Sequence, residues 1–171
     1  MLAMISRRIR ALTVFAIACT GTSIARDNWR VRQDGVGPVK IDMKLSDLNT
    51  LLHEKFSMPE NKDDQGCFYL NPTKHPHIAF MMEDGRLVRV DVDGPGVLTA
   101  QGIQVGDFEA RALQVYGSGM KVQPQKYTEG HYLTVRSSSG RFGIRFETDK
   151  GKIQAFYAGR FEAIQYVEGC Q

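Results

Sequence analysis

Short segments that alternate apolar and polar residues around tight glycine turns constrain the fold of this chain most. Ile78 to Glu83 and Arg86 to Asp93 flank Asp84-Gly85, a dipeptide that favours a type I′ hairpin because both of its positions tolerate a positive φ. The pattern therefore predicts an antiparallel hairpin. The expected cross-strand neighbours on one face are Met81 with Val88 and Ala79 with Val90, with Val92 beyond them.

A three-stranded meander is predicted further along the chain. Its strands are His131 to Arg136, Arg141 to Glu147 and Lys152 to Ala158, and glycine-ending turns join them. Successive side chains of a strand point to opposite faces of the sheet. The middle strand should therefore bury one set of residues and leave the other wet. The expected buried set is Phe142, Ile144 and Phe146, and the expected wet set is Arg141, Gly143, Arg145 and Glu147.

Two short helices are predicted from helical spacing of apolar residues. The first should begin at Ser46 as N-cap, and the second should begin at Asp107 and stop at Gly117. Neither would be stable alone, so both should lie on the sheet. The expected apolar stripes are Leu48, Leu51, Leu52 and Phe56 in the first helix and Phe108, Ala112, Val115 and Tyr116 in the second.

The two halves of the chain have the same predicted order. An apolar lead-in, 39–43 or 103–105, precedes a helix, a loop and antiparallel strands around a tight turn. We therefore expect an α+β fold of tandem helix-then-β-hairpin repeats, with two short helices packed on one antiparallel sheet. Residues 26–98 would form the first unit and 99–171 the second, in one compact domain. A single α+β domain whose halves resemble each other by accident is the alternative.

The N-terminus has the order of a secretory signal. Three arginines (Arg7, Arg8 and Arg10) precede an apolar run from Ala11 to Ala18 and a group of small residues ending at Ala25. The apolar run is shorter than the roughly 20 residues that a membrane-spanning helix needs. We therefore predict a signal peptide over 1–25 and a periplasmic or secreted protein.

Two cleavage chemistries compete at this N-terminus. Ser23 and Ala25 suit an ordinary signal peptidase, which would release a soluble protein beginning at Arg26. Alternatively, residues 16–19 resemble a lipobox, in which Cys19 would be lipidated and would anchor the protein at the outer membrane. Membrane association is expected only in that second case.

Loss of the signal changes the charge balance of the chain. The first 25 residues contain three arginines and no acidic residue, so the mature chain has 19 basic and 19 acidic side chains. A formal net charge near zero removes the argument for a nucleic-acid partner that the whole-chain pI of 8.8 suggests. We expect no nucleic-acid binding.

Two cysteines, Cys67 and Cys170, remain in the mature chain. In an oxidising compartment such an isolated pair predicts a disulfide. It would close a loop of about a hundred residues and tie the C-terminal segment to the middle of the fold. Two free thiols are the alternative.

The lead-in to the first helix resembles that of a known family. Residues 37–46 (GPVKIDMKLS) are similar to the "I-x-x-G-M-T" segment of the SmpA/OmlA outer-membrane-assembly lipoproteins. Here Asp42 stands at the family's glycine and Lys44 at its capping threonine, so the cap should move to Ser46. The tandem layout resembles the beta-lactamase inhibitor proteins, which repeat a helix-plus-hairpin unit.

Exported bacterial proteins of unassigned function provide a closer likeness. They share a Gly-Pro-Val-x-Ile-x-Met lead-in, a central stretch like residues 92–97 (VDGPGV) and a closing Glu-Gly-Cys like residues 168–170. These resemblances imply a non-enzymatic scaffold that presents a sheet face or loops to another protein. They transfer no functional residue.

Signals of catalysis or metal binding are weak. His75, His77 and His131 could form a surface metal site, but a polar strand entrance is the favoured explanation. The carboxylates after Asp91 do not continue as a calcium loop, and no nucleophile motif occurs. We therefore predict no catalytic residue, no metal and no cofactor.

Arginine and tyrosine residues of the meander provide the predicted binding face. Tyr127, Tyr132, Arg141 and Arg145 have the composition of protein-binding hot spots, although an ordinary wet sheet face would look the same. We expect an exported envelope or periplasmic protein-binding module, an inhibitor or accessory factor, whose partner is another envelope or secreted protein. The alternatives are a small secreted hydrolase or metal-dependent enzyme with a site between the two units, and a lipid-anchored envelope structural factor.

Overall fold

The fold is taken from a computed structural model of the whole chain, in which residues 29–170 are described. The predicted signal segment, with Cys19 and Ala25, lies outside the described residues. None of the helices within 29–170 is long and apolar enough to cross a membrane.

The described chain is an α+β fold with two antiparallel sheets. The larger sheet has seven strands in the order β4-β5-β6-β10-β9-β8-β7, and the smaller has three in the order β1-β2-β3. The strands of the larger sheet are β4 (Cys67–Leu70), β5 (Ile78–Glu83), β6 (Arg86–Val92), β7 (Met120–Pro124), β8 (His131–Arg136), β9 (Phe142–Asp149) and β10 (Lys152–Arg160). Those of the smaller sheet are β1 (Val31–Arg32), β2 (Gly35–Val36) and β3 (Val39–Lys40). The helices are α1 (Leu45–Leu52) and α2 (Glu109–Tyr116), with 3-10 turns η1 (Lys62–Gln65), η2 (Gly117–Gly119) and η3 (Ala163–Gln165).

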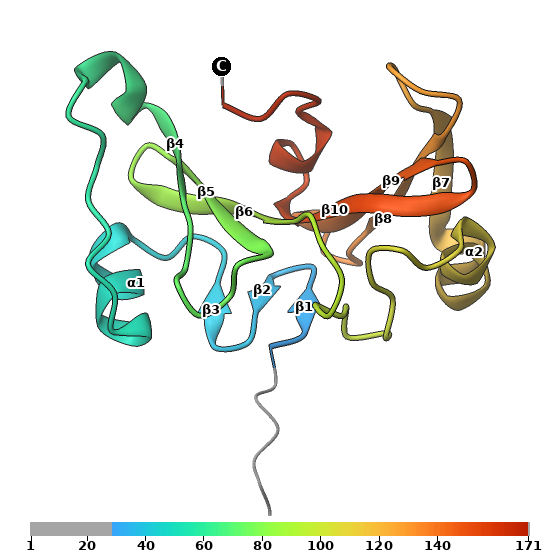
Figure 1. Cartoon of the computed structure of the whole chain (residues 1–171), viewed down its shortest axis with the longest axis horizontal. Helices are drawn as coiled ribbons and strands as arrows, with labels where there is room; N and C mark the ends of the chain where they lie inside the picture. The colour runs from blue at the N-terminus through green and yellow to red at the C-terminus, as the bar shows by residue number, and fades with distance from the viewer. Residues whose placement is uncertain (1–28, 171) are drawn as a thin grey trace, which may run out of the picture.

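The seven-stranded sheet separates two layers (Figure 1). Helices α1 and α2 lie at its two ends and the three-stranded sheet lies between them, all on one side. The C-terminal segment from Phe161 onward lies on the other side. The main core forms on the helix side, where Leu48 of α1, Ala112 of α2 and Val36 of β2 pack with inward residues of the large sheet. We call these two sides the inner face and the outer face.

Both helices begin close to their predicted positions, but with different caps. The N-cap of α1 is Lys44 rather than Ser46, and the Asp47 carboxylate accepts the Lys44 backbone N–H at 3.2 Å. The N-cap of α2 is Phe108 rather than Asp107. Helix α2 ends at Gly117 with φ of 62°, as predicted. Each helix is eight residues long, which is too short to be stable without the sheet.

The register of the first hairpin differs from the prediction. Asp84 and Gly85 have positive φ, as the turn requires, but a bulge at Val88 shifts the pairing by one residue. Met81 therefore lies opposite Arg89 and Ala79 opposite Asp91. Because of this shift, Arg89 and Asp91 point to the outer face while Val90 and Val92 join the inner core.

The lead-ins to the two helices make the same hydrogen bonds to the large sheet. Before α1, the Asp42 N–H donates to the Leu87 carbonyl (2.8 Å) and the Leu87 N–H donates to the Met43 carbonyl (2.9 Å). Before α2, the Gly106 N–H donates to the Ile153 carbonyl (2.8 Å) and the Ile153 N–H donates to the Asp107 carbonyl (3.0 Å). The φ of Asp42 is 76° and that of Gly106 is 90°.

The turns that precede these two strands also match. Asp84 and Gly85, before β6, have φ of 49° and 72°, and Lys150 and Gly151, before β10, have φ of 49° and 73°. Strands β6 and β10 then lie side by side at the centre of the large sheet, antiparallel to each other. Each half thus brings its last strand to the middle of the molecule.

Candidate functional site

The four residues of the predicted binding face do not share an exposed surface. Arg145 is only 5% exposed and Tyr132 only 6%. Tyr127 is 58% exposed and lies beside the C-terminal segment, where its hydroxyl contacts the Glu168 carboxylate. Arg141 is exposed, but it pairs with Asp42 at the start of the first helix. The prediction of an open face carrying Arg141 and Arg145 together is therefore wrong.

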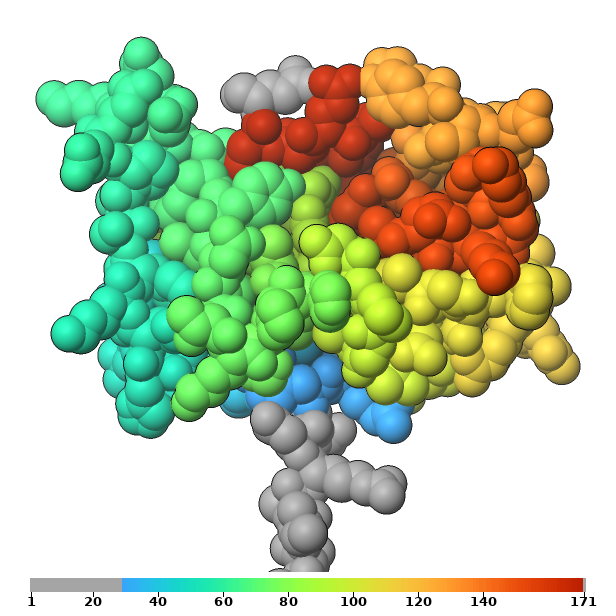
Figure 2. Space-filling view, viewed as in Figure 1, coloured from blue at the N-terminus to red at the C-terminus, as the bar shows by residue number. Residues whose placement is uncertain are grey.

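The physical reason is that the C-terminal segment covers the outer face. The alternation in β9 is as predicted, with Phe146 and Ile144 in the core. The other side of β9 meets the 3-10 turn η3. Gly143 lies so close beneath it that an added Cβ would come within 2.7 Å of the Ile164 side chain. The space-filling view shows the C-terminal segment, in red, packed beside the loop that follows β7, in orange (Figure 2).

Arg145 holds this segment from the second half of the sheet. Its Nη1 donates to the Gln165 carbonyl (3.3 Å) and its Nη2 to Gln165 Oε1 (2.6 Å). Its Nε donates to Thr134 Oγ1 (3.1 Å) on the neighbouring strand β8. The guanidinium also lies 4.6 Å from the ring centroid of Tyr132. These contacts use the donors of Arg145 within the fold.

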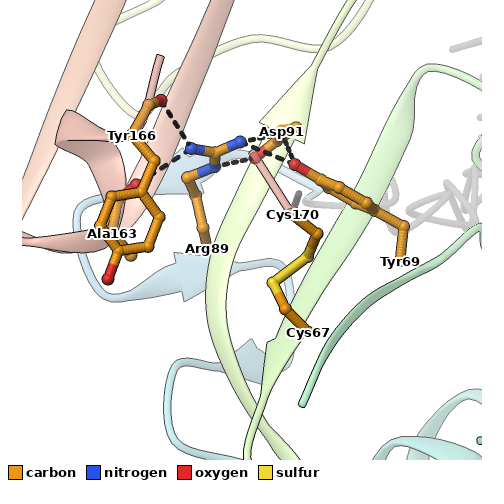
Figure 3. A network of polar contacts seen from close by, with 7 residues as sticks. All are labelled: Cys67, Tyr69, Arg89, Asp91, Ala163, Tyr166 and Cys170. Carbon is orange, nitrogen blue, oxygen red and sulfur yellow. Dashed lines mark hydrogen bonds and ion pairs between the residues drawn. A yellow bond between two sulfur atoms is a disulfide. The ribbon is translucent and has the colours of Figure 1, made fainter. Parts of the chain in front are cut away.

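Arg89 holds the segment from the first half (Figure 3). Its Nη1 donates to the carbonyls of Ala163 (2.9 Å) and Tyr166 (3.2 Å). Its Nε donates to Asp91 Oδ1 (2.6 Å) and its Nη2 to the Tyr69 hydroxyl (2.7 Å). Arg89 is only 2% exposed, so the bulge at Val88 has placed a charged residue under the C-terminal segment with all its partners supplied.

The predicted disulfide is present at the same place. Cys67 of β4 and Cys170 are joined, with Sγ atoms 2.02 Å apart, and the bond lies beside Tyr69 in Figure 3. Both half-cystines pack on a small second core of Met81, Val88 and Ala163 on the outer face. The bond therefore fastens the end of the second half to the edge strand of the first.

Burial dominates the electrostatics beneath the C-terminal segment. Desolvation raises the pKa of the Asp91 carboxyl, although the Arg89 guanidinium opposes the shift. It also raises the pKa of the Glu147 carboxyl, which accepts a hydrogen bond from Tyr157. The pKa of Tyr69 rises to about 12 for the same reason. Other groups of the same chain occupy the donors and acceptors of these side chains. We therefore regard them as structural.

An open pocket lies elsewhere, at the start of the first helix. It has a volume of about 640 Å³ and we call it the arginine pocket. It combines four arginines with two carboxylates, a formal charge of +2. Its lining residues are Asp42, Arg86, Arg136, Ser139, Gly140, Arg141, Phe142, Arg160 and Glu162.

Asp42 is central to the arginine pocket. Its Oδ1 accepts from Arg160 at 2.7 Å (Nε) and 2.6 Å (Nη2), whereas its Oδ2 lies 3.3 Å from Arg141 Nη2. The short double contact makes Arg160 the main partner of the carboxylate. Arg141 is 69% exposed and keeps most of its donors toward solvent.

The remaining two arginines are fixed by uncharged groups. Arg86 Nη1 donates to the Asp42 backbone carbonyl (2.9 Å), and Arg136 Nε donates to the Gly140 carbonyl (2.7 Å). The Arg136 guanidinium lies 4.0 Å from the ring centroid of Phe161, a cation–π contact. Carbonyls and rings orient a guanidinium without neutralising it, so both groups keep their charge for a ligand.

The histidines considered as metal ligands have separate partners. His75 stacks on Trp29, with ring centroids 3.5 Å apart, while His77 Nδ1 lies 3.2 Å from Asp93 Oδ1. His131 Nδ1 lies 3.0 Å from Glu109 Oε1. Among residues 29–170, no group of three or more His, Cys, Asp or Glu side chains is arranged to hold a metal ion.

The His131 and Glu109 pair is the nearest approach to an acid–base site. It borders a pocket of about 470 Å³ in the second half, not between the two halves as the hydrolase alternative required. The adjacent Thr148 hydroxyl donates to Glu109 Oε2 (2.7 Å), and the Thr148 residue is 1% exposed. A hydroxyl buried this deeply is not open to a substrate, so it is not placed to act as a nucleophile.

The predicted binding face contained one arginine of the arginine pocket, Arg141, and none of the other three. Arg86 directly follows a turn, and Arg160 lies beyond the predicted end of the last strand. No local pattern connects them to Asp42, which is distant in sequence. The one available signal was Asp42 itself, an aspartate at a position where glycine was expected.

No protein-family model, curated protein or solved structure matches this chain.

Proposed function

We propose that the protein is an exported, non-catalytic binding module that contacts another envelope or secreted protein through the arginine pocket. The supporting observation is the pocket itself, which holds four arginines around one strongly paired carboxylate, Asp42. Arginine is enriched among the residues that dominate binding energy in protein interfaces. The sequence predicted binding at the outer face, but the protein's own C-terminal segment covers that face.

The module is proposed to be a tandem of two helix-plus-strand units. In favour of this are the matched hydrogen bonds of the two lead-ins, the positive φ shared by Asp42 and Gly106, and the equal length of the helices. The two units would share one sheet across β6 and β10. The boundary near residue 98 falls between the end of β6 and the lead-in to α2.

Export to an oxidising compartment is proposed from the signal-like N-terminus and the disulfide. A single bond between distant cysteines is typical of periplasmic or secreted proteins, because the cytosol keeps such thiols reduced. The mass of the mature N-terminal peptide decides between a soluble and a lipid-anchored protein. A protein beginning at Arg26 would be soluble, whereas one beginning at a diacylated Cys19 would be a lipoprotein and support the structural-factor alternative.

Affinity capture from the native envelope tests the proposal. The bait is the mature protein, and the test variant carries Arg86→Ala and Arg141→Ala together. We expect one partner at stoichiometric amount with the wild type and its loss with this variant. A control variant, Lys62→Ala with Lys121→Ala, removes two exposed charges outside the pocket and should retain the partner. Capture of no partner, or equal capture by all three proteins, would refute the proposal.

A further inference from the structure

We infer that the arginine pocket recognises an acidic segment of its partner, and that Asp42 is the positioning residue that prepares the arginines for it. This inference rests on the proposed function and names the chemistry of the group bound. Three observations carry it: the state of each guanidinium, the size of the pocket, and the backbone conformation of Asp42.

The pocket keeps a formal charge of +2 after Asp42 and Glu162 are counted against its four arginines. Arg160 is neutralised by its double contact with Asp42. Arg86 and Arg136 are anchored by backbone carbonyls, and Arg141 has only one long contact with Asp42. Hydrogen bonds between guanidinium and carboxylate are about twice as strong as neutral ones. An incoming carboxylate therefore meets Arg86 and Arg136, which neutral groups orient, and Arg141, whose contact with Asp42 is long.

The size of the pocket favours several carboxylates over one small anion. Its volume of about 640 Å³ lies within the range of about 300–1,000 Å³ that is typical of pockets for larger ligands. The three arginines other than Arg160 also come from different segments, with Arg86 at the start of β6 and Arg136 and Arg141 flanking the turn between β8 and β9. Donors spread in this way suit a chain of carboxylates rather than a single point charge.

The backbone of Asp42 gives an independent reason to assign it a role. Its φ of 76° lies in a region that disfavours residues with a Cβ, and the matching residue in the other half is Gly106, with φ of 90°. Aspartate adopts this region more readily than most residues with a Cβ, and such conformations are often kept where function requires the side chain. In the first half the side chain is retained, and it holds Arg160 in place.

A synthetic hexaglutamate peptide with a fluorescent label tests the ligand class. Anisotropy titration of the mature protein should show salt-sensitive binding. Loss of a charged hydrogen-bonding partner should weaken binding about tenfold in Arg86→Ala or Arg141→Ala. The Lys62→Ala, Lys121→Ala variant is the matched control and should bind like the wild type. Absence of binding, equal binding by all variants, or preference for inorganic phosphate over the peptide would overturn the inference.

The variant Asp42→Gly separates positioning from simple charge. Glycine already occupies the matching position of the second half, at Gly106. A glycine at position 42 should therefore preserve the fold. Removal of a carboxylate makes the pocket more positive, and charge alone predicts tighter binding of hexaglutamate. If Asp42 instead positions the arginines of the pocket, through its contacts with Arg141 and Arg160, its loss should weaken binding by about threefold or more at an unchanged melting temperature. Tighter binding would remove Asp42 from the inference.

The two proposals can fail separately. If the captured partner depends on Arg86 and Arg141 but hexaglutamate does not bind, the acidic-segment inference falls and the protein-binding proposal stands. If hexaglutamate binds in the pocket and no partner is captured, the protein-binding proposal falls and recognition of carboxylates by the pocket stands.

Discussion

The outer face and the arginine pocket use the same type of side chain in opposite ways. On the outer face, Arg89 and Arg145 are almost fully buried and donate to carbonyls of the C-terminal segment. In the arginine pocket, Arg141 is 69% exposed, and Arg86 and Arg136 are oriented by neutral groups. Because a buried charge must have its partners within the fold, the first pair is committed to structure. The second set remains available to a ligand.

This comparison shows why exposure cannot be inferred from residue type. Arginine and tyrosine on one strand face have the composition of a binding site, yet here they bind a segment of the same chain. The network in Figure 3 is in effect an interface within the molecule, closed by the disulfide. Functional interest therefore moves to Arg86, Arg136 and Arg141, which are exposed within the described part of the chain.

The largest expected effect comes from Arg89→Ala. This change leaves Asp91, the Tyr69 hydroxyl and two carbonyls without their donor, and breaking a buried ion pair costs about 3–5 kcal/mol. Urea denaturation of the variant should show a loss of that size. A loss below about 1 kcal/mol would mean that the outer face is not held by its arginines.

The next effect comes from Cys67→Ser. Loss of a disulfide that closes a loop of this length should lower the free energy of unfolding by about 2–4 kcal/mol. The C-terminal segment should also become sensitive to limited proteolysis, with peptides beginning after Phe161. The double variant Cys67→Ser, Cys170→Ser is the control and should match the single one. A C-terminal segment that remains protected would show that Arg89 and Arg145 suffice to hold it.

A smaller effect should distinguish the two lead-ins. Gly106→Ala introduces a Cβ at positive φ and should lower stability by about 1–2 kcal/mol. Asp42→Gly relieves strain but loses a half-exposed ion pair, so its stability should stay within about 0.5 kcal/mol of the wild type. Thermal denaturation of the two variants in parallel measures the difference. If Gly106→Ala and Asp42→Gly lower the melting temperature equally, Asp42 serves stability, and its assignment to ligand binding would be contradicted.

A pH effect is expected on the covered side. Burial raises the pKa of Glu147 above its usual 4.5, so the folded state binds a proton that the unfolded state releases. Stability from this group is present below pH 4.5 and is lost as pH rises through the raised pKa. The variant Glu147→Gln should lack this loss. Urea denaturation of the wild type and the variant from pH 4 to pH 8 measures the free energy of unfolding at each pH. Parallel dependence of the two free energies on pH would contradict the prediction.

The smallest effect on stability is expected in the arginine pocket. Arg141→Ala removes an exposed side chain with one long ion contact, so its free energy of unfolding should change by no more than about 0.5 kcal/mol. A loss comparable to that of Arg89→Ala would erase the distinction between the two groups of arginines.

Much of the secondary structure was predictable because it depends on local pattern. The strand His131–Arg136, the Asp84-Gly85 turn and the stop at Gly117 were all predicted, and so was the cysteine pair. Strands β4 and β7 were missed, as was the small three-stranded sheet. These elements are short and depend on neighbours distant in sequence. The bulge at Val88 was missed for the same reason, since no local signal marks it.

The sequence alone determined that this chain forms antiparallel strands with two short helices, because alternation and turn residues act within a few positions. Only the tertiary structure decided that the outer face of the sheet is covered. A period of two specifies which side chains share a face, but it cannot specify whether a distant segment will cover that face. The C-terminal segment covers Arg89 and Arg145. Asp42 contacts Arg86, Arg141 and Arg160 of the pocket, and the last of these lies 118 positions away in the sequence.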